Sequence, residues 1–461
     1  MERLAIVILA AGEGKRMKSK LPKILHPICG RPMIQYLFET TSKIEAEKRI
    51  IIVGYKSDQV TDFLRGLLSE GDEILLQPRQ LGSGDGARVA QKGLANFIGD
   101  VLVLGADTPF LSVKTLLSLV ACHRKERAAA TLLTARLDDP TGYGRIIRGK
   151  DGQIERIVEE KDASSGELLV NEVNSGVYCF SAQSLFWGLP QLSDQNMQRE
   201  FYLTDLVEML TRHGDKVIGL EVSYLDEIMG INNRIDLAKA EAFAKKQILD
   251  RLMLEGVSII DPASTFIEGE VEIGKDTIIY PFSMILGRSL IGEDCIIGPQ
   301  AYILDTQMED RVKVVASFIK DSIIGAETQI GPFVHIRPKT NLGKEIKIGN
   351  FVEVKASSIH NQTKVNHLTY IGDSFIGEGV NIGAGTITCN YDGCEKHCTT
   401  IEDGAFIGSN TALVAPVKIG KNAVIGAGST ITEDVPEFSL AVARANQRII
   451  SEWARKKKET Y

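Results

Sequence analysis

From about residue 267 to residue 431, large apolar residues recur at every sixth position, with mostly small or polar residues between them. Six is a multiple of the strand period of two but not of the helical period of 3.6, so these residues share one face only on an extended backbone. The pattern therefore predicts a series of short strands with a common interior face. It is carried by three runs: Ile267, Ile273, Ile279, Ile285, Ile291, Ile297 and Ile303; Val312, Phe318, Ile324, Ile330, Ile336, Leu342, Ile348 and Val354; and Ile401, Ile407, Leu413, Ile419, Ile425 and Ile431.

Glycines and small residues accompany this repeat. Glycine directly follows many of the apolar residues, as at Gly274 and Gly325, and we expect a positive φ there that turns the chain sharply. A small residue such as Thr277 stands four positions after many of the apolar residues and is expected to share the interior face. Short strands with regular corners wind into a solenoid of stacked coils. With three strands per coil, we expect a parallel β-helix of roughly nine coils spaced about 4.8 Å apart.

The first half of the chain alternates between strands and helices. An apolar run at residues 3–12 predicts a strand buried on both faces. Such alternation predicts a mostly parallel sheet with helices on both faces, which binds ligands at the carboxyl ends of its strands. Further strands are expected at 49–53, 73–77, 100–104, 128–135 and 216–222, helices at 33–44, 58–69, 84–97 and 113–126, and a hairpin from 142 through 161.

A glycine-rich loop at residues 12–16 follows the first strand. Its glycines allow backbone N–H groups to approach an anion, and Lys15, Arg16 and Lys23 can place positive charge on a triphosphate. The glycine spacing matches neither a Walker A loop nor a dinucleotide fingerprint. The loop therefore indicates a phosphate-binding site of another kind.

Two further loops at the carboxyl ends of strands suit a nucleotide. Gln77 is expected to read a base edge, with Gly82 and Ser83 passing close to the base. Asp107 is expected to hold a divalent metal ion on the phosphates. Polar groups that could serve sugar hydroxyls follow at residues 142–145, 159–161 and 171–177.

A long helical pattern from residue 230 to about residue 255 connects the sheet to the solenoid. We therefore expect an α/β domain at residues 1–229, a helical linker at 230–255 and a β-helix domain with a C-terminal tail at 256–461.

Composition narrows the function classes. A net charge of −7 and a pI near 5.7 argue against a nucleic-acid partner. Apolar stretches are too short to cross a bilayer, so no membrane insertion is expected. Seven cysteines fit a reducing cytoplasm better than a disulfide framework.

Polar insertions interrupt the hexad at residues 366–370 and 389–400, and solenoids usually carry their sites on such loops. The second insertion contains Cys389, Cys394, His397 and Cys398, which have the thiol and imidazole groups that bind zinc. Their spacing lacks a Cys-x-x-Cys pair, so zinc is not favoured and no function is assigned to Cys394, His397 and Cys398.

Several motifs resemble known families. The sugar-1-phosphate nucleotidyltransferases are matched by residues 9–17 (Leu-Ala-Ala-Gly-x-Gly-x-Arg-Met), 21–23, 80–84, 107–109 and 142–145. With residues 349–355, 367–370 and 381–393 added, the whole chain resembles the bacterial bifunctional UDP-N-acetylglucosamine pyrophosphorylase/glucosamine-1-phosphate N-acetyltransferase family. The resemblance implies a Rossmann-like α/β nucleotidyltransferase domain, a long connecting helix and a left-handed parallel β-helix of hexapeptide repeats.

For the first domain, the resemblance implies transfer of UMP from UTP to N-acetylglucosamine-1-phosphate, giving UDP-N-acetylglucosamine and diphosphate. Positioning and charge neutralisation should dominate such a reaction. Arg16 and Lys23 are implied at the triphosphate, and Asp107 and Asn232 as ligands of Mg²⁺. The residues implied at the substrates are Leu9, Ala10, Ala11, Gly12, Gln77, Gly82, Ser83, Gly144, Glu159, Asn174 and Asn232.

For the second domain, the resemblance implies N-acetylation of glucosamine-1-phosphate by acetyl-CoA, which precedes uridylyl transfer in the synthesis of peptidoglycan and lipopolysaccharide precursors. An ammonium cannot attack a thioester, and His367 has a side chain suited to remove its proton and matches the family's base. Arg337 and Lys355 are implied at the sugar phosphate. Tyr370 and Asn381 are implied at the sugar, and Ala384, Asn390, Tyr391, Ser409, Ala427 and Arg444 at acetyl-CoA.

The family also implies a homotrimer whose solenoids share the acetyl-transfer site.

The sequence departs from the family's usual pattern at two places. Ala106 replaces a usual glycine and is expected to shift the backbone at Asp107 slightly. Asp85-Gly86 replaces a common His-Ala and is expected to change only packing at a helix start.

Two alternatives remain open: a transferase for a different amino sugar or nucleotide, and a non-catalytic regulatory scaffold. The scaffold is disfavoured because such proteins lose their catalytic residues, whereas this chain keeps Lys23, Asp107, Asn232, Lys355 and His367.

Overall fold

The computed structural model describes residues 3–458. The chain divides into two compact units, Met1–Ala244 and Lys245–Tyr461, and each is described by itself. Within the described residues, no helix combines the length and the apolar character needed to cross a membrane.

The first unit is built on a nine-stranded sheet. Its central strand β1 (Leu4–Ala10) pairs in parallel with β4 (Lys48–Val53) and β6 (Asp100–Gly105). The mostly parallel sheet is confirmed, with an antiparallel strand β10 (Glu172–Ser181) between β6 and β7 (Ala130–Arg136). The remaining strands are β5 (Asp72–Leu76), β11 (Val217–Glu221) and the hairpin of β8 (Gly144–Arg148) and β9 (Ile154–Val158).

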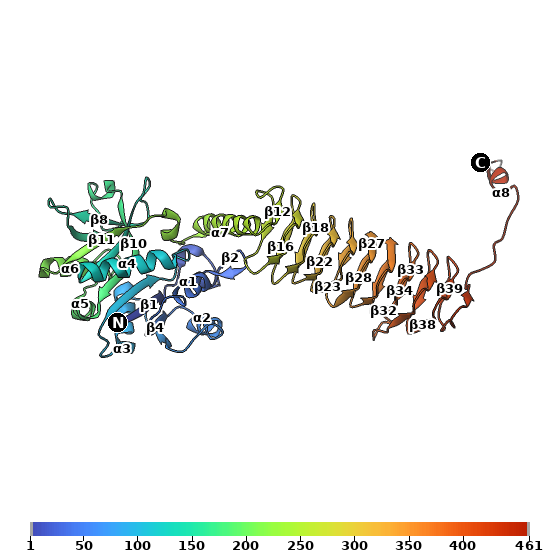
Figure 1. The fold of residues 1–461 in the computed structure, drawn as a ribbon, viewed down its shortest axis with the longest axis horizontal. Helices are drawn as coiled ribbons and strands as arrows, with labels where there is room; N and C mark the ends of the chain where they lie inside the picture. The colour runs from blue at the N-terminus through green and yellow to red at the C-terminus, as the bar shows by residue number, and fades with distance from the viewer. Residues whose placement is uncertain (1–2, 459–461) are drawn as a thin grey trace. The chain divides into compact units, whose positions relative to one another are not determined.

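Helices cover both faces of this sheet (Figure 1). Successive residues of a strand point to opposite faces, and Ile6 and Val7 of β1 accordingly belong to two different buried clusters. The first cluster includes residues of α1 (Met33–Thr41), α2 (Ser57–Leu64) and α4 (Val113–Glu126). The second includes residues of α3 (Ser83–Gly93), α5 (Ala182–Gly188) and α6 (Asp205–His213).

Short elements complete the unit. They are the 3₁₀ helices η1 (Lys15–Met17), η2 (Lys23–Leu25), η3 (Glu167–Leu169), η4 (Leu189–Gln191) and η5 (Leu225–Ile228), and the hairpin of β2 (Pro27–Ile28) and β3 (Arg31–Pro32).

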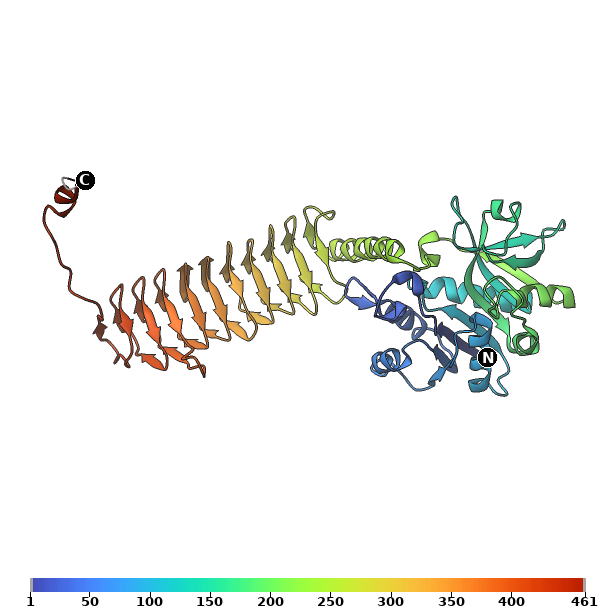
Figure 2. The same cartoon turned by 180° about the vertical axis from the view of Figure 1, so that it is seen from behind.

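The second unit is a β-helix whose three faces are parallel sheets of eleven, ten and nine strands. Its coils follow one another along the unit in both views (Figures 1 and 2). The predicted left-handed β-helix of hexapeptide repeats is confirmed, and it is slightly longer than the nine coils expected. The faces run from β12 (Ser258–Ile259) to β41 (Leu440–Ala441), from β13 (Phe266–Ile267) to β40 (Thr430–Ile431), and from β14 (Glu272–Ile273) to β38 (Val417–Ile419).

The interior of the β-helix contains the hexad residues and the small residues, both of which are buried as predicted. The prediction for Phe318 is wrong, because this side chain is 58% exposed and Ile319 takes the interior position. Val312 is buried, but it lies two residues before the interior residue Val314 and so takes the small-residue position. The phase shifts because some coils here are shorter than eighteen residues: Met308 pairs with Ile324.

The glycines of the repeat also differ from the prediction. Gly274 and Gly325 do not adopt positive φ, and the corners instead place non-glycine residues such as Asp276 and Glu327 in that region. A Cβ added to Gly325 would lie 2.5 Å from the backbone of Gly343 in the next coil. These glycines are therefore required for close stacking of coils, not for turning the chain.

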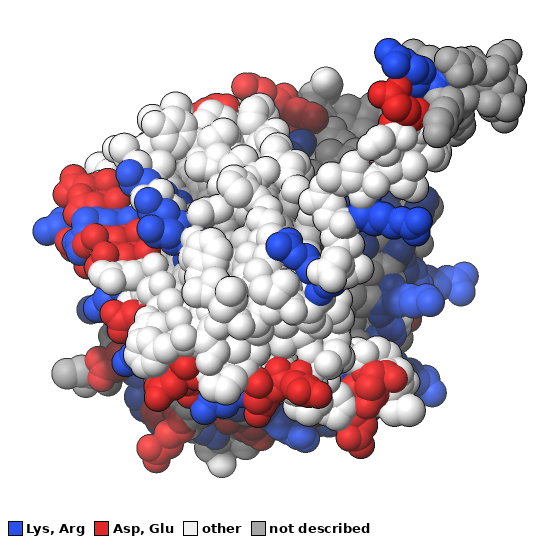
Figure 3. Space-filling model, turned by 90° about the vertical axis from the view of Figure 1, so that its right-hand side faces the viewer, with Lys and Arg blue, Asp and Glu red and all other residues white. Residues whose placement is uncertain are grey.

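Helix α7 (Arg234–Leu254) forms where the long helix was expected, and α8 (Trp453–Lys458) follows the last coil. Figure 3 views the structure from the right-hand side of Figure 1. Few charged residues lie at the centre of this view, and charged residues lie around its edge. In the last coil, Phe438, Leu440 and Val442 are all more than half exposed.

Candidate active sites

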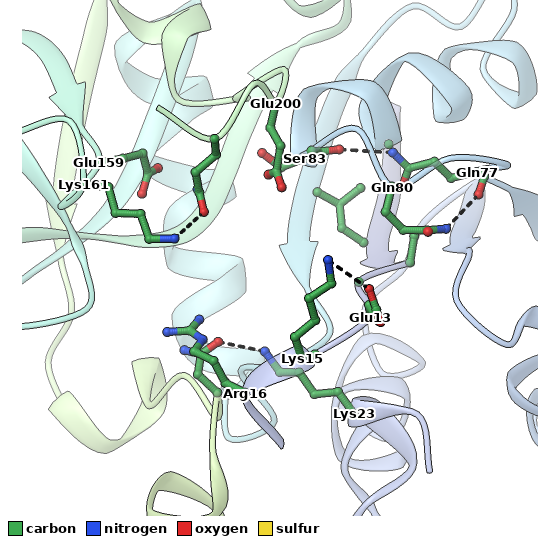
Figure 4. Close-up of a pocket in the computed structure, with 18 of the residues that line it drawn as sticks. Glu13, Lys15, Arg16, Lys23, Gln77, Gln80, Ser83, Glu159, Lys161 and Glu200 are labelled. Atoms are coloured by element: carbon green, nitrogen blue, oxygen red, sulfur yellow. Dashed lines mark hydrogen bonds and ion pairs between the residues drawn. The ribbon is translucent and has the colours of Figure 1, made fainter. Parts of the chain in front are cut away.

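A cavity of about 610 Å³ lies at the carboxyl ends of β1 and β5 in the first unit. In Figure 4, Gln77 and Gln80 lie on one side of it, and Glu159 and Lys161 on the other. The structure thus brings together residues from loops far apart in the sequence. The predicted residues that line the cavity are Leu9, Ala11, Gly12, Arg16, Lys23, Gln77, Gly82, Ser83, Glu159 and Asn232.

Lys23 is a largely buried cation in this cavity. It begins η2, and its side chain is 10% exposed. Its Nζ donates hydrogen bonds to Asp107 Oδ2 at 2.6 Å and to Asn232 Oδ1 at 2.9 Å. Burial raises the pKa of Asp107, but the positive charge of Lys23 and its hydrogen bond outweigh burial, so the net pKa lies below its ordinary value. Asp107 is therefore an anion at neutral pH.

Asp107 and Asn232 turn their side-chain oxygens toward one cationic group, the ammonium of Lys23. The N–H of Ile231 donates to the Asp107 carbonyl at 3.0 Å, which ties together the two segments that carry these oxygens. One carboxylate and one amide oxygen suit Mg²⁺, which keeps several waters and takes further oxygens from substrate phosphates. Among the described residues, no group of three or more His, Cys, Asp and Glu side chains is placed to hold a metal ion. A metal ion at Asp107 and Asn232 would therefore need oxygens from water and substrate phosphates as well.

The expected shift at Ala106 finds no support in the backbone. Ala106 is buried, does not adopt positive φ, and donates its N–H to the Leu9 carbonyl at 3.0 Å. An alanine therefore fits this position without strain.

The sugar end of the cavity contains Glu159, which follows β9. Thr204 Oγ1 donates to Glu159 Oε1 at 3.2 Å, and burial raises the pKa of Glu159. A Cβ added to Gly144 would lie 3.6 Å from both Glu159 carboxylate oxygens, so the Gly144 backbone lies beside them. Asn174 is not among the lining residues: it is buried and its Nδ2 donates to the Tyr178 hydroxyl at 2.7 Å. Ala10 is likewise buried in β1.

Asp85 has a different role from the one predicted. It lies in the first turn of α3, where its Oδ2 accepts a hydrogen bond from Gln77 Nε2 at 2.7 Å. Gln77 Nε2 also donates to the Gly82 carbonyl at 3.2 Å. The departure at Asp85 therefore changes more than helix-start packing, because it fixes a side chain of the cavity.

A second candidate site lies on the β-helix around His367. This residue ends β30 (Lys364–His367) and is paired in register with Asn350, the last residue of β27 (Lys347–Asn350) in the preceding coil. His367 Nδ1 lies 2.7 Å from Asn350 Oδ1. The amide oxygen accepts a hydrogen bond, so Nδ1 carries the proton and Nε2 keeps a lone pair. The imidazole is exposed, so Nε2 is accessible to a substrate.

Cationic side chains lie on the next face of the β-helix, at its edge away from His367. Arg337 NH1 contacts Glu353 at 2.8 Å, and Lys355 Nζ lies 3.4 Å from Asp373 Oδ2. Lys396 lies beside Lys355, and its close contact with Lys355 and the positive charge of Lys355 lower the pKa of Lys396. Two ammonium groups this close favour the binding of an anion between them.

Polar groups of the neighbouring coils lie next to these cations. A Cβ added to Gly372 would lie 2.4 Å from the Tyr370 hydroxyl and 2.8 Å from Asn390 Nδ2, so both groups lie over Gly372. Asn390 Nδ2 also donates to Asp373. Asn381 begins β33 (Asn381–Ile382), paired in register with β30.

Three of the six residues expected at acetyl-CoA lie at one corner of successive coils. They are Ala384, Ser409 and Ala427, each two residues after a buried isoleucine. The Ala384 carbonyl accepts from Asn410 N–H at 2.7 Å, and the Ala427 carbonyl accepts from Arg444 NH1 at 2.7 Å. Tyr391 is 60% exposed on the inserted loop.

In the cysteine-containing loop, His397 Nε2 lies 2.7 Å from Asp392 Oδ2, and Asp392 Oδ1 accepts from the Cys394 N–H at 2.8 Å. Cys394 and Cys398 are exposed. Among the residues that the structure describes, this loop forms no cluster suited to a metal ion.

Comparison with known proteins assigns both halves. Residues 6–199 match the model of the MobA-like NTP transferase domain, residues 266–348 that of the GMPPB C-terminal domain, and residues 398–433 that of the bacterial transferase hexapeptide. The bifunctional protein GlmU of Shouchella clausii is 46% identical over 441 residues, covering 96% of each chain. This chain belongs to the bifunctional GlmU family. Two further GlmU proteins support this assignment. That of Exiguobacterium sp. is 47% identical over 97% of this chain and 98% of its own length, and that of Acetivibrio thermocellus is 46% identical over 99% and 98%.

Sequence reasoning did not select several residues that the structure places in or beside the two candidate sites. Gln198 and Glu200 line the first cavity and Asp85 contacts its Gln77, while Asn350, Asp373 and Lys396 contact predicted residues of the second site. For Asn350 and Asp373 a signal existed, since each stands about one coil from a predicted residue.

Proposed function

We propose that this chain, like the GlmU family that it resembles, acetylates glucosamine-1-phosphate with acetyl-CoA and then transfers UMP from UTP to the N-acetylated product. Two features of one chain carry the proposal. A carboxylate and an amide oxygen lie beside a buried lysine in an α/β cavity, and an exposed histidine lies on a hexapeptide β-helix.

In the first reaction, His367 Nε2 takes a proton from the substrate ammonium. The free amine then attacks the thioester carbonyl of acetyl-CoA, the C–S bond breaks, and the thiol of CoA leaves with a proton. Asn350 keeps the imidazole in the required tautomer. Arg337, Lys355 and Lys396 hold the phosphate of the sugar through charge-assisted hydrogen bonds. Tyr370 and Asn381 contact the sugar, and Ala384, Asn390, Tyr391, Ser409, Ala427 and Arg444 bind acetyl-CoA.

In the second reaction, a phosphate oxygen of N-acetylglucosamine-1-phosphate attacks the α-phosphorus of UTP and diphosphate leaves. Lys23 and Arg16 neutralise the triphosphate, and Gly12 and its neighbours bring backbone N–H groups to it. Asp107 and Asn232 would hold Mg²⁺, which supplies further positive charge on the phosphates when it is bound. Gln77, Gly82 and Ser83 hold the uridine, while Glu159 and the Gly144 backbone beside it position the acetylated sugar. Asn174 does not line the cavity, since it is buried against Tyr178.

The protein works as a homotrimer in the cytoplasm. The second site is open in a single chain, since His367 is exposed, and a neighbouring β-helix would close it. None of the seven cysteines, all within the described residues, forms a disulfide, which suits a reducing compartment.

Phosphorus NMR of the protein with glucosamine-1-phosphate, acetyl-CoA, UTP and magnesium tests both reactions, with acetyl-CoA omitted from a parallel tube. UDP-N-acetylglucosamine only in the complete tube supports the two reactions in this order. A UDP-sugar without acetyl-CoA would contradict the order, and the absence of product from both tubes would favour a different sugar or a scaffold role.

A further inference from the structure

Gln77 is held rigidly at the wall of the first cavity. It directly follows β5, its N–H donates to the Val53 carbonyl at 2.8 Å, and its side chain is 3% exposed. A side-chain amide buried to this extent has one defined set of partners, since an unsatisfied polar atom would be costly.

The partners of this amide determine which way it faces. Nε2 contacts Asp85 Oδ2 at 2.7 Å and the Gly82 carbonyl at 3.2 Å. A carboxylate and a backbone carbonyl can only accept hydrogen bonds, so the group facing them must be the NH₂ of Gln77. The opposite assignment would bring three acceptor oxygens together. The chemistry of the partners thus orients the amide without reference to hydrogen positions.

Asp85 itself is well anchored. It lies in the first turn of α3, where a negative charge is favoured by the helix dipole. The start of α3 is tied down from both sides, because Gly84 N–H donates to the Phe201 carbonyl at 2.8 Å and Leu203 N–H donates to Ser83 Oγ at 3.0 Å. Asp85 therefore presents a fixed acceptor to Gln77.

The oxygen of the amide is turned toward the cavity. A Cβ added to Gly86 would lie 3.6 Å from Gln77 Oε1 and 3.1 Å from Leu9 Cδ2, and all three residues line the cavity. Gly86 has no side chain, so the space beside Oε1 stays open. An acceptor is thus presented to whatever ligand lies against Leu9 and Gly86.

We propose that Asp85 is a positioning residue for base selection: it locks Gln77 with Oε1 toward the nucleobase, so that the site requires a ring N–H donor. This inference rests on the proposed uridylyl transfer and specifies how its nucleotide is chosen. Uracil carries a donor N–H at ring position 3. Cytosine carries a lone pair there, which would face the lone pairs of Oε1 in a buried site and leave both unsatisfied.

The test compares UTP with CTP in Asp85→Ala and Asp85→Asn. Alanine removes the acceptor, so the amide can rotate and offer its NH₂ to cytosine. Asparagine keeps an acceptor oxygen but adds a donor, so the lock is weakened and not removed. We expect the ratio of kcat/KM for UTP to kcat/KM for CTP to fall about tenfold in Asp85→Ala, the loss of roughly one hydrogen bond's discrimination. Asp85→Asn should give an intermediate ratio.

Asp62→Asn is the matched control, because it removes an exposed carboxylate of the same unit that contacts only Arg65 among the described ion pairs. The urea unfolding transition of the first unit, compared with that of the unsubstituted protein, reports whether each variant is folded. If kcat/KM for UTP and CTP fell in parallel in Asp85→Ala with their ratio unchanged, Asp85 would have a merely structural role and the inference would be wrong. If the unsubstituted protein did not use UTP at all, the proposed function would fail instead.

Discussion

At the scale of single residues, the proposed acetyl-transfer site depends on a pair of residues from two coils. Asn350 Oδ1 lies 2.7 Å from His367 Nδ1 and selects the tautomer with a lone pair on Nε2. Asn350→Ala removes that selection but keeps the imidazole, so acetyl transfer should slow about tenfold. His367→Ala removes the base and should cost about 10²- to 10⁴-fold. Release of CoA thiol, followed as initial rate against substrate, measures both.

Uridylyl transfer should be unchanged in both variants, because its residues lie in the other unit. Asn341→Ala is a suitable control, since Asn341 is an exposed asparagine of the same β-helix. Equal loss of the two activities in a variant that remains folded and assembled would contradict independent sites.

The sequence predicted His367 but not its partner, and the reason is coil length. Asn350 and His367 are seventeen residues apart, whereas Ile279 and Ile297 pair at eighteen and Met308 and Ile324 at sixteen. A register error of one residue turns every side chain to the other face of a strand. The sequence therefore identifies the coil of a partner without identifying the partner itself. The sequence marked Asp85 but gave it a packing role, because its contact with Gln77 depends on how the loop before α3 folds back.

At the scale of elements, the hexad predicts the interior correctly wherever coils keep eighteen residues. It fails at Phe318, where shorter coils move Ile319 to the interior. Periodicity likewise shows where glycine recurs but not its structural reason. The close stacking of coils involves residues about eighteen positions apart, so the local sequence of one strand does not reveal it. The α/β unit was easier, since its strands are long and strongly apolar.

Gly325 offers a test of the stacking argument. Gly325→Ala places a Cβ within 2.5 Å of the Gly343 backbone, and backbone cannot move aside as a flexible side chain does. We expect the local free energy of opening to fall by about 1–3 kcal/mol, as in other overpacked interiors. Hydrogen–deuterium exchange of peptides from residues 320–345 should accelerate. Gly166→Ala, where an added Cβ meets nothing within 4 Å, should leave exchange unchanged.

The start of helix α6 makes the first unit sensitive to pH. Burial, with smaller contributions from Glu208 and Asp162, raises the pKa of Asp205 to about 6 from 3.8. The folded state therefore binds more protons than the unfolded state between these values, and stability is lost as pH rises through that range. Asp205→Asn does not titrate, so relative to the unsubstituted protein it should gain about 1–2 kcal/mol from pH 4 to pH 7, allowing for partial exposure.

Urea unfolding followed by tryptophan fluorescence measures this difference, because Trp187 on α5 contacts His213 on α6 with ring centroids 4.4 Å apart. Asp194→Asn, which removes an exposed carboxylate of the same unit, should show no such trend. A gain that was the same at pH 4 and pH 7 would exclude titration of Asp205 as its cause.

At the scale of the whole molecule, an apolar ridge lies beside His367, the proposed base of acetyl transfer. Phe333, Phe351 and Leu368 occupy one corner of three successive coils, and each is more than half exposed. The rings of Phe333 and Phe351 stack with centroids 5.4 Å apart. Contiguous exposed apolar area of this kind indicates an interface, and the proposed trimer supplies its partner.

Phe351→Glu should therefore weaken self-association, because burying a carboxylate in an apolar contact is costly. Sedimentation should show a mass of three times 50.5 kDa for the unsubstituted protein and smaller species for the variant. In the Phe351→Glu variant, acetyl transfer per chain should fall on dilution and recover at high protein concentration, as mass action requires. Uridylyl transfer per chain should stay constant. Leu169→Glu, at an 84% exposed leucine of the first unit, should do neither. A Phe351→Glu variant that kept both its mass and its acetyl transfer on dilution would show that the ridge is not the interface on which the second site depends.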